Sequence, residues 1–365
     1  MKITFKHTPE QIELVKAMAS KDKNVAYEAQ AALATLIQPT LAEVINQAPV
    51  LSNLFTEIRY NADDNVSIPL DLYYDVTDED YVEVWSQTQA GGLPTNQVLP
   101  TMSELKMFTY SLDTAVSFDR KYAAKSRLDV VAKTFTRVAQ EILLKQNTMS
   151  ANVAMTALAN ATTNGLSHVI SATAANRFVL ADLNALMTRA KRINTSWYGG
   201  TPQGGIAQRG ITDLLVSPEI VQEIRSMAYN PINTAASLQG VSSVKDSIAA
   251  PDELRMSIFN SAGIPEFYGV SILEFNELGD GKSFNNVFGD AYSGSFTNAS
   301  DQIIVGIDRG RDSLVRAIAV DENDGTFSLQ VDDQYSIRQG KIGYWGGLEE
   351  GRACLDNRAL VGIIV

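Results

Sequence analysis

Residues 130–159, VVAKTFTRVAQEILLKQNTMSANVAMTALA, contain neither glycine nor proline. As an α-helix this stretch would be about 45 Å long. A compact chain of 365 residues has a radius of gyration of about 21 Å, so the helix would cross nearly the whole molecule. A helix of this length would either cross the core of a compact protein or belong to a molecule that is not spherical.

The helix is predicted over residues 128–159, and a strand is predicted just before it. In the strand MFTYSLDTAVSF, residues 107–118, apolar side chains alternate with polar ones and share one face: Phe108, Tyr110, Leu112, Val116 and Phe118. In the helix, apolar residues recur at three- and four-residue spacing: Leu128, Val131, Phe135, Val138 and Ile142. A single apolar stripe predicts that the helix is covered along one side only.

Residues 60–105 hold nine acids and no lysine or arginine: Asp63, Asp64, Asp71, Asp75, Asp78, Glu79, Asp80, Glu83 and Glu104. Alternating apolar residues predict two strands, and the run AGGLPTNQVLP, residues 90–100, predicts a turn between them. One interpretation is a solvated acidic loop. The other interpretation is a hairpin that packs on another protein surface, because isolated two-stranded hairpins are marginally stable in water.

The charge reverses after this hairpin. Residues 106–145 carry eight bases and four acids. Either the two segments neutralise each other within one chain, or the hairpin reaches the helix of a neighbouring copy. Electrostatic complementarity of this kind favours register and choice of partner.

The rest of the chain mixes short helices and strands. Thr8 is expected to cap a first helix, and a second helix is expected to stop before Pro39. Further helices are predicted near 183–193, 217–224 and 251–263, and strands dominate after residue 264. The segments SLVRAIAV (313–320) and TFSLQV (326–331), joined by DENDG, predict a hairpin.

Composition excludes several classes of protein. The net charge of −12 argues against a sequence-reading nucleic-acid binder, although not against a protein that surrounds nucleic acid. No apolar run approaches about 18 residues, so no membrane span is expected. Cys354 is the only cysteine, so no intrachain disulfide can form and a reducing compartment is expected.

No motif in the sequence indicates catalysis. The glycine-rich segment 197–210 lacks the ending of a phosphate-binding loop, and DENDG lacks the spacing of a calcium loop. Neither histidine, His7 or His168, lies near a nucleophile motif. We therefore expect no catalytic, cofactor-binding or metal-binding residues. An α+β enzyme whose site is assembled from dispersed groups, such as His168 or Asp308, remains an alternative.

The order of these parts resembles the major capsid protein of tailed bacteriophages, which has the α+β fold called Hong Kong 97-type. Four segments carry the resemblance: TYSLDTAVSFDRKYAAKS (109–126), DLLVSPEIVQEIR (213–225), GIPEFYGVSIL (263–273) and the C-terminal residues 332–365. The resemblance implies a helical N-terminal arm (1–56), an extended E-loop hairpin (57–112), a peripheral domain with a spine helix at about 128–159 (113–199 and 326–365), and an axial domain (200–325).

The resemblance also implies where subunits would meet. The E-loop would lie across a neighbouring subunit and contact it through Asp75, Asp78, Glu79, Asp80, Glu83 and Trp85. The candidate basic surface that receives the loop comprises Arg120, Lys121, Lys125, Arg127, Lys133 and Arg137. We call these six residues the basic surface.

The implied function is structural. Such proteins assemble as hexamers and pentamers into an icosahedral virion capsid that encloses double-stranded DNA, in the cytoplasm of the bacterial host. Scaffolding and portal proteins are expected partners in DNA packaging, and we expect no sequence-specific DNA binding and no membrane. Because no long extension precedes the first helix, a separate scaffolding protein is expected. Alternatives are an encapsulin-type nanocompartment, a tail or baseplate protein, and the enzyme considered above.

Overall fold

The computed structural model describes residues 8–47, 51–61, 66–69, 104–163, 165–173, 176–193, 210–229, 232–233, 247–248, 266–267, 269–320, 325–332 and 340–365. The chain forms two compact units, each with its own hydrophobic core. Unit 1 combines described residues up to Ile68 with Glu104–Ser150 and Leu314–Ala353. Unit 2 combines Ala151–Ser313 with Cys354–Val365. The assignment of segments to arm, E-loop, peripheral and axial domains stays a prediction.

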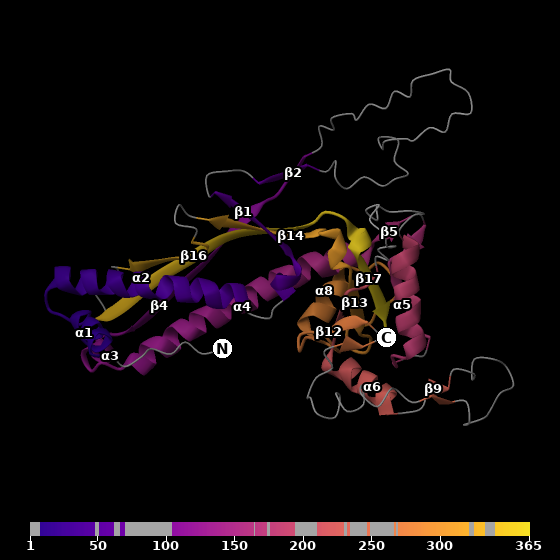
Figure 1. Ribbon diagram of the computed structural model, residues 1–365, viewed down its shortest axis with the longest axis horizontal. Helices are drawn as coiled ribbons and strands as arrows, with labels where there is room; N and C mark the ends of the chain where they lie inside the picture. Colours follow the sequence, from indigo (N-terminus) through magenta and orange to yellow (C-terminus); the bar gives the residue numbers. More distant parts are fainter. Residues whose placement is uncertain are drawn as a thin grey trace, which may run out of the picture. The chain divides into compact units, whose positions relative to one another are not determined.

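Unit 1 is built on a five-stranded sheet (Figure 1). The strands are β1 (Thr56–Asn61), β4 (Thr109–Asp119), β14 (Leu314–Val320), β15 (Ser328–Asp332) and β16 (Lys341–Cys354). Their order is β1-β14-β16-β15, and β4 pairs antiparallel with β16 from Thr109 opposite Gly351 to Asp119 opposite Lys341. β1 and β14 are parallel. The two arms of the predicted hairpin, which leave through β1 and return through β4, therefore belong to one sheet.

The hairpin predicted over residues 313–331 is wrong. Both of its strands form, as β14 and β15, but each hydrogen-bonds to β16 in the sheet order. The Asp-Gly turn signal is local, whereas the choice of partner strand depends on the long β16, which offers more hydrogen bonds than a short hairpin would.

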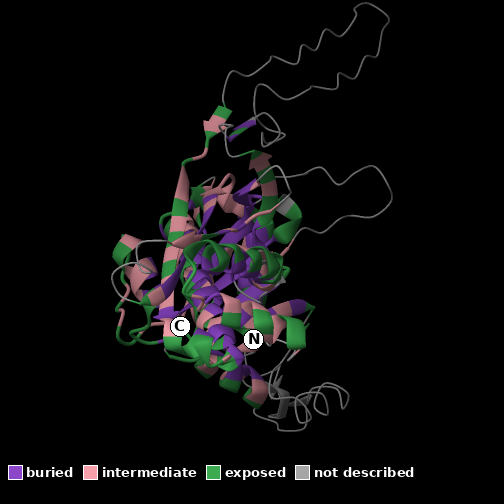
Figure 2. Cartoon of the chain, turned by 90° about the vertical axis from the view of Figure 1, so that its left-hand side faces the viewer, coloured by how far each residue is buried: buried purple, intermediate pink, exposed green. Residues whose placement is uncertain are grey.

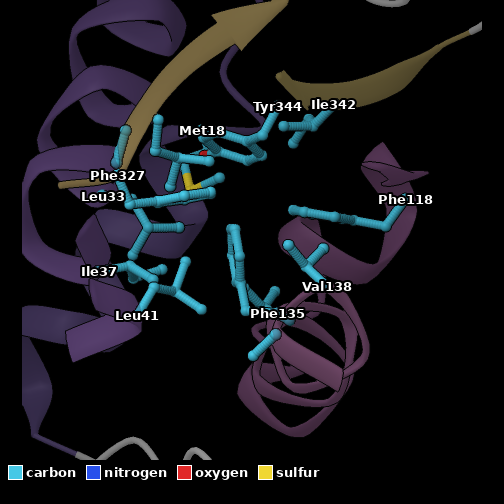
Figure 3. Packing of buried hydrophobic residues seen from close by; sticks show 14 of the residues in the cluster. Met18, Leu33, Ile37, Leu41, Phe118, Phe135, Val138, Phe327, Ile342 and Tyr344 are labelled. Carbon is cyan, nitrogen blue, oxygen red and sulfur yellow. The ribbon is translucent and has the colours of Figure 1, made fainter. Parts of the chain in front are cut away.

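Four helices cover one face of this sheet: α1 (Pro9–Ala17), α2 (Lys23–Gln47), α3 (Arg120–Ala124) and the first part of α4 (Leu128–Ala159). The bounds predicted for the long helix are confirmed. Its predicted stripe is buried, and Phe135 is fully enclosed, with its ring 5.4 Å from that of Tyr344. Figure 3 shows Phe135 and Val138 pointing toward side chains from α2 and β16. The oxygen of Thr8 accepts the hydrogen bond from the Gln11 N–H, as expected of an N-cap.

The prediction that the second helix stops before Pro39 is wrong, because α2 continues to Gln47. A proline inside a helix removes one hydrogen bond and costs about 3 kcal/mol. Here the apolar residues Leu33, Ile37, Leu41 and Ile45 lie on both sides of Pro39 and are all buried. Their burial, at about 1.5–3 kcal/mol each, outweighs the cost of the proline.

The apolar face predicted for the strand at 107–118 is confirmed only in its later part. Phe118 is buried, and Leu112 and Val116 pack against the core. Phe108, however, lies before β4 and is 93% exposed. Along β4, half-buried residues alternate with exposed ones (Figure 2). The core ends before it reaches Phe108, so period-two spacing alone overestimated its burial.

Among the described residues, unit 2 contains a six-stranded sheet, three further helices and the last part of α4 (Figure 1). The sheet order is β11 (Glu266–Phe267), β12 (Val270–Glu274), β8 (Asp213–Val216), β13 (Ile303–Ile307), β17 (Leu360–Ile364) and β7 (Val169–Ser171). The helices are α5 (Leu180–Ile193), α6 (Pro218–Tyr229) and α8 (Ser283–Ala291). The helix predicted at 251–263 lies outside the described residues.

Short strand pairs complete the described structure. They are β2 (Ser67–Pro69) with β3 (Glu104–Lys106), β5 (Thr162–Thr163) with β6 (Leu166–Ser167), and β9 (Ile232–Asn233) with β10 (Ser247–Ile248). In the part of the chain that the structure describes, 3-10 turns lie at Leu51–Leu54 (η1), Arg309–Arg311 (η4) and Asn357–Ala359 (η5).

Candidate subunit-contact surface

The acidic residues predicted to contact a neighbouring subunit lie outside the described residues. They are Asp75, Asp78, Glu79, Asp80, Glu83 and Trp85. The structure does describe both roots of this hairpin, at the end of β1 and the start of β4. The contacts of these two roots attach both arms to unit 1.

Two adjacent glutamates of β16 each accept a hydrogen bond from one root. The hydroxyl of Tyr60, in β1, donates to Glu349 Oε1 at 3.2 Å. The hydroxyl of Tyr110, in β4, donates to Glu350 Oε1 at 3.2 Å. Successive residues of a strand point to opposite faces of the sheet. The outgoing and returning arms are thus fixed to β16 on its two faces.

Glu350 is the centre of a buried ion network. Its carboxylate is fully buried and pairs with Arg316 (Nη2 to Oε2, 3.1 Å) and with Arg352 (Nη2 to Oε2, 3.0 Å). Arg352 Nη1 also contacts both Glu350 Oε1 and the Tyr110 hydroxyl. Gln146 Nε2, from α4, donates to Oε2 at 3.1 Å. One carboxylate therefore joins β4, β14, β16 and α4.

The same network reaches the turn η1. Arg352 Nη2 donates to Ser52 Oγ at 3.0 Å, and Ser52 Oγ lies 2.9 Å from Ser150 Oγ of α4. The N–H of Leu51 donates to Asn147 Oδ1 at 3.1 Å. These contacts attach the segment that enters β1 to the long helix.

Burial shifts the pKa values of several groups in this network. Desolvation raises the pKa of Tyr60 to about 12, and Glu349 adds to the effect. Desolvation also raises the pKa of Tyr110 to about 12, against the opposing influence of Arg352. Both phenols therefore remain protonated donors near neutral pH. Desolvation lowers the pKa of Arg316, and the attraction of Glu350 works against that shift.

The basic surface begins with two residues of α3 that have partners in their own chain. Arg120 is half-buried, and its Nε donates to the carbonyl of Ala19 at 3.3 Å. Lys121 forms an exposed ion pair with Asp119 at 3.2 Å, and this pairing raises its pKa. Its ammonium also lies 5.5 Å from the centroid of the Tyr122 ring.

The other four members of the basic surface, Lys125, Arg127, Lys133 and Arg137, are exposed. In the described part of the chain none of their side chains has a hydrogen-bond or ion-pair partner. Lys133 and Arg137 are four residues apart on α4, so they share the face opposite the buried stripe. The structure thus places two charges of the basic surface together on the uncovered side of the helix.

The residues considered for an enzymatic site each have a structural role in the fold. His168 is fully buried; its Nδ1 lies 3.0 Å from the Leu360 carbonyl and its Nε2 2.9 Å from Thr163 Oγ1. Burial lowers its pKa. Burial raises the pKa of the Cys354 thiol to about 12, which suppresses the reactive thiolate. Asp308 caps η4 by accepting from the Gly310 N–H at 3.0 Å.

Within the described ranges, no group of three or more His, Cys, Asp or Glu residues is arranged to hold a metal ion. In that same part of the chain, no helix combines the length and apolarity that crossing a membrane would require.

Comparison with known proteins identifies the fold. The capsid of the native GTA particle matches with a TM-score of 0.51, over 88% of this chain and 89% of that chain, at 10% sequence identity. The chain has the Hong Kong 97-type capsid fold.

Two further structures that resemble this Hong Kong 97-type chain are weaker matches. The capsid of the cyanophage P-SCSP1u gives a TM-score of 0.46 at 12% identity, over 87% of this chain and 88% of that chain. The holo-SrpI encapsulin complex from Synechococcus elongatus PCC 7942 gives 0.45 at 12% identity, over 86% and 85%. No protein-family model and no curated protein matches the sequence. Identities this low show the fold alone.

Sequence reasoning missed the residues that hold the hairpin roots in this Hong Kong 97-type chain: Tyr60, Tyr110, Arg316, Glu349, Glu350 and Arg352. A signal was present in the segment IGYWGGLEEGRAC (342–354), where two acids and an arginine interrupt a run of apolar and glycine residues. Charged residues in a strand that is otherwise apolar are buried only when they are paired.

Proposed function

We propose that this chain is the major capsid protein of a tailed bacteriophage, a structural protein that assembles as hexamers and pentamers into an icosahedral shell around double-stranded DNA. The observation that supports it most is the Hong Kong 97-type fold, matched over nearly the full length of both chains. The proposed role is structural and not catalytic. The shell would be assembled in the host cytoplasm and become the virion capsid.

The proposed contact between subunits is electrostatic. The acidic hairpin carries Asp75, Asp78, Glu79, Asp80 and Glu83, and would lie on the basic surface of a neighbouring copy. Four exposed bases of that surface lack a partner in the described part of their own chain, which supports an intermolecular role. Complementary charge of this kind sets register and partner choice.

The proposed partners are a separate scaffolding protein and a portal protein, with DNA enclosed without sequence-specific contacts. The net charge of −12 supports enclosure without tight adhesion. In the encapsulin alternative, the shell would instead hold an enzyme cargo. Analysis of the contents of purified particles separates the two, because DNA favours the capsid and a protein cargo favours the nanocompartment.

Light scattering of the purified chain tests the proposal. We expect particles far larger than a hexamer at some salt concentration, either with the chain alone or with its scaffolding protein. A chain that remains monomeric or dimeric under every such condition would contradict the proposed function.

A further inference from the structure

The unit 1 sheet has a pocket on the face that the helices do not cover. Along β16, Tyr344, Leu348 and Glu350 are buried toward the core, whereas Trp345 is 39% exposed on the other face. Gly347 and Glu349 share the face of Trp345, because side chains alternate along a strand. On β4, Ser111 lies opposite Glu349, and Asp113 opposite Gly347.

A pocket of about 160 Å³ is lined by Ser111, Asp113, Trp345, Gly347 and Glu349, together with Thr326 and Ser328. That volume is well above the roughly 10–15 Å³ that one water molecule needs. Gly347 keeps the pocket open, because a Cβ there would lie 2.5 Å from Asp113 Oδ1. The pocket therefore has room for the end of a side chain.

The chemistry of the pocket suits a cation. Asp113 accepts a hydrogen bond from Ser111 Oγ at 2.7 Å, and Glu349 accepts one from Tyr60 at 3.2 Å. Neither carboxylate forms an ion pair with a lysine or arginine of the described chain. Beside them lies an indole ring, which is the aromatic face that attracts cations most strongly. Two carboxylates without an ion-pair partner in the described residues, together with an indole ring, favour the binding of an ammonium or guanidinium group.

The bases of α4 in the same chain cannot supply that cation. α4 packs against the core face of the sheet, where Phe135 meets Tyr344, and the pocket lies on the opposite face. The acidic hairpin cannot supply it either, because residues 60–105 contain no lysine or arginine. A base of a second copy is an occupant whose charge fits the pocket.

Six exposed bases without a side-chain partner in the described ranges lie between residues 106 and 145. Four of these six are lysines: Lys106, Lys125, Lys133 and Lys145, alongside Arg127 and Arg137. We propose that the pocket formed by Asp113, Trp345 and Glu349 binds a lysine ammonium of a second copy of this chain. This inference rests on the proposed function, because it describes a contact within the shell.

A carbodiimide, which joins a carboxylate only to an amine in contact with it, tests the contact. Shells are assembled from a mixture of 14N- and 15N-labelled chains, treated with the reagent and examined by mass spectrometry. We expect mixed-isotope peptide pairs that join Asp113 or Glu349 to a lysine. Shells that lack such mixed pairs would overturn the inference.

The variant Asp113→Asn/Glu349→Gln keeps both hydrogen-bond acceptors and removes both charges. We expect it to lose these crosslinks and to need about threefold or more protein for assembly, the effect of one weak ion pair per contact. The control Glu28→Gln/Glu141→Gln removes two charges from exposed helix positions and should assemble as the wild type does. An unchanged assembly concentration for the first variant would also overturn the inference. If the wild type forms no particles at all, the proposed function fails, and this inference with it.

Discussion

Glu350 lies at the centre of the buried ion network of unit 1. Its carboxylate is fully buried between Arg316 and Arg352, and it also accepts from Tyr110 and Gln146. Burying such charges is costly, and the network is stable because every charge is paired. The residue therefore holds one root of the hairpin to the body of its unit.

The substitution Glu350→Gln should lower the free energy of unfolding by about 3–5 kcal/mol, because it leaves two buried arginines without their counter-charge. Urea unfolding followed by circular dichroism measures the loss. The neighbouring Glu349→Gln is the matched control and should cost less than about 1.5 kcal/mol, because only the hydrogen bond from Tyr60 is affected. Equal losses for the two variants would contradict the role assigned to Glu350.

His168 should make the protein less stable as the pH falls. Its folded-state pKa lies below the ordinary value of 6.5 because the ring is buried, so below pH 6.5 the unfolded chain binds a proton that the folded chain does not. Asp356 partly opposes this shift, and Arg189 adds to it. Stability should therefore fall below pH 6.5, by up to about 1.4 kcal/mol per pH unit for this group.

Urea unfolding of the wild type and of His168→Gln at pH 7.0, 6.0 and 5.5, all above the ordinary range of carboxyl groups, checks this expectation. The variant should be less stable at pH 7.0, and its stability should decline less steeply toward pH 5.5. Parallel declines in the two proteins would show that another group titrates.

The contacts made by single residues were the hardest feature to predict from the sequence. The bases of the basic surface are close together along the chain, at 120–137, so the sequence indicates them as a candidate surface. The network around Glu350 could not be predicted, because Ser52, Tyr110, Gln146 and Arg316 are brought together only by the sheet order and by α4. Its contacts join residues up to 300 positions apart.

At the scale of elements, α4 organises the core of unit 1. Leu128, Val131, Phe135, Val138 and Ile142 are all buried, and the opposite side carries exposed residues such as Lys133 and Arg137. A helix of 32 residues with one buried stripe depends on tertiary packing for its stability.

The substitution Phe135→Ala should destabilise the protein by about 3–5 kcal/mol, because it leaves a cavity against Tyr344. Thermal unfolding by calorimetry measures the change. Leu144→Ala on the same helix is the matched control, because Leu144 is 53% exposed, and it should change stability by about 0.5 kcal/mol or less. A large loss at Leu144 instead would mean that the helix is covered in solution by another surface.

Elements with a long and regular pattern were predictable. The position of α4 followed from an apolar stripe at helical spacing within a stretch that lacks glycine and proline. The end predicted for α2 at Pro39 was wrong because buried residues on both sides of the proline outweigh its local cost. The partner of β14 was mispredicted because strand pairing is a long-range choice that a turn motif does not decide.

At the scale of the whole molecule, the acidic hairpin should act between copies. Reversing three charges in Asp78→Lys/Glu79→Lys/Asp80→Lys should abolish or strongly impair assembly while leaving the helix content of the monomer unchanged. Light scattering measures assembly, and far-ultraviolet circular dichroism measures helix content. A loss of helix content would instead place these contacts within one chain.

A compensating variant sharpens this experiment. Lys133→Glu/Arg137→Glu alone should also impair assembly, and combining it with the reversed hairpin should restore part of it. Independent, additive losses would show that the hairpin and these two bases do not meet.

The fold class was predictable because the order of parts is distinctive: a helical arm, an acidic hairpin, a long helix and C-terminal strands. The residues proposed to make the hairpin contacts lie outside the described residues, so these contacts stay a prediction. What a single chain does show is charge without an ion-pair partner among the described residues, on four members of the basic surface and in the pocket beside Trp345.

Negative-stain electron microscopy of the purified chain, with its scaffolding protein where the chain alone does not assemble, tests the central claim most directly. Self-assembly predicts closed, uniform, icosahedral particles built of hexamers and pentamers. A field of separate monomers, or of open rings and tubes, would contradict it.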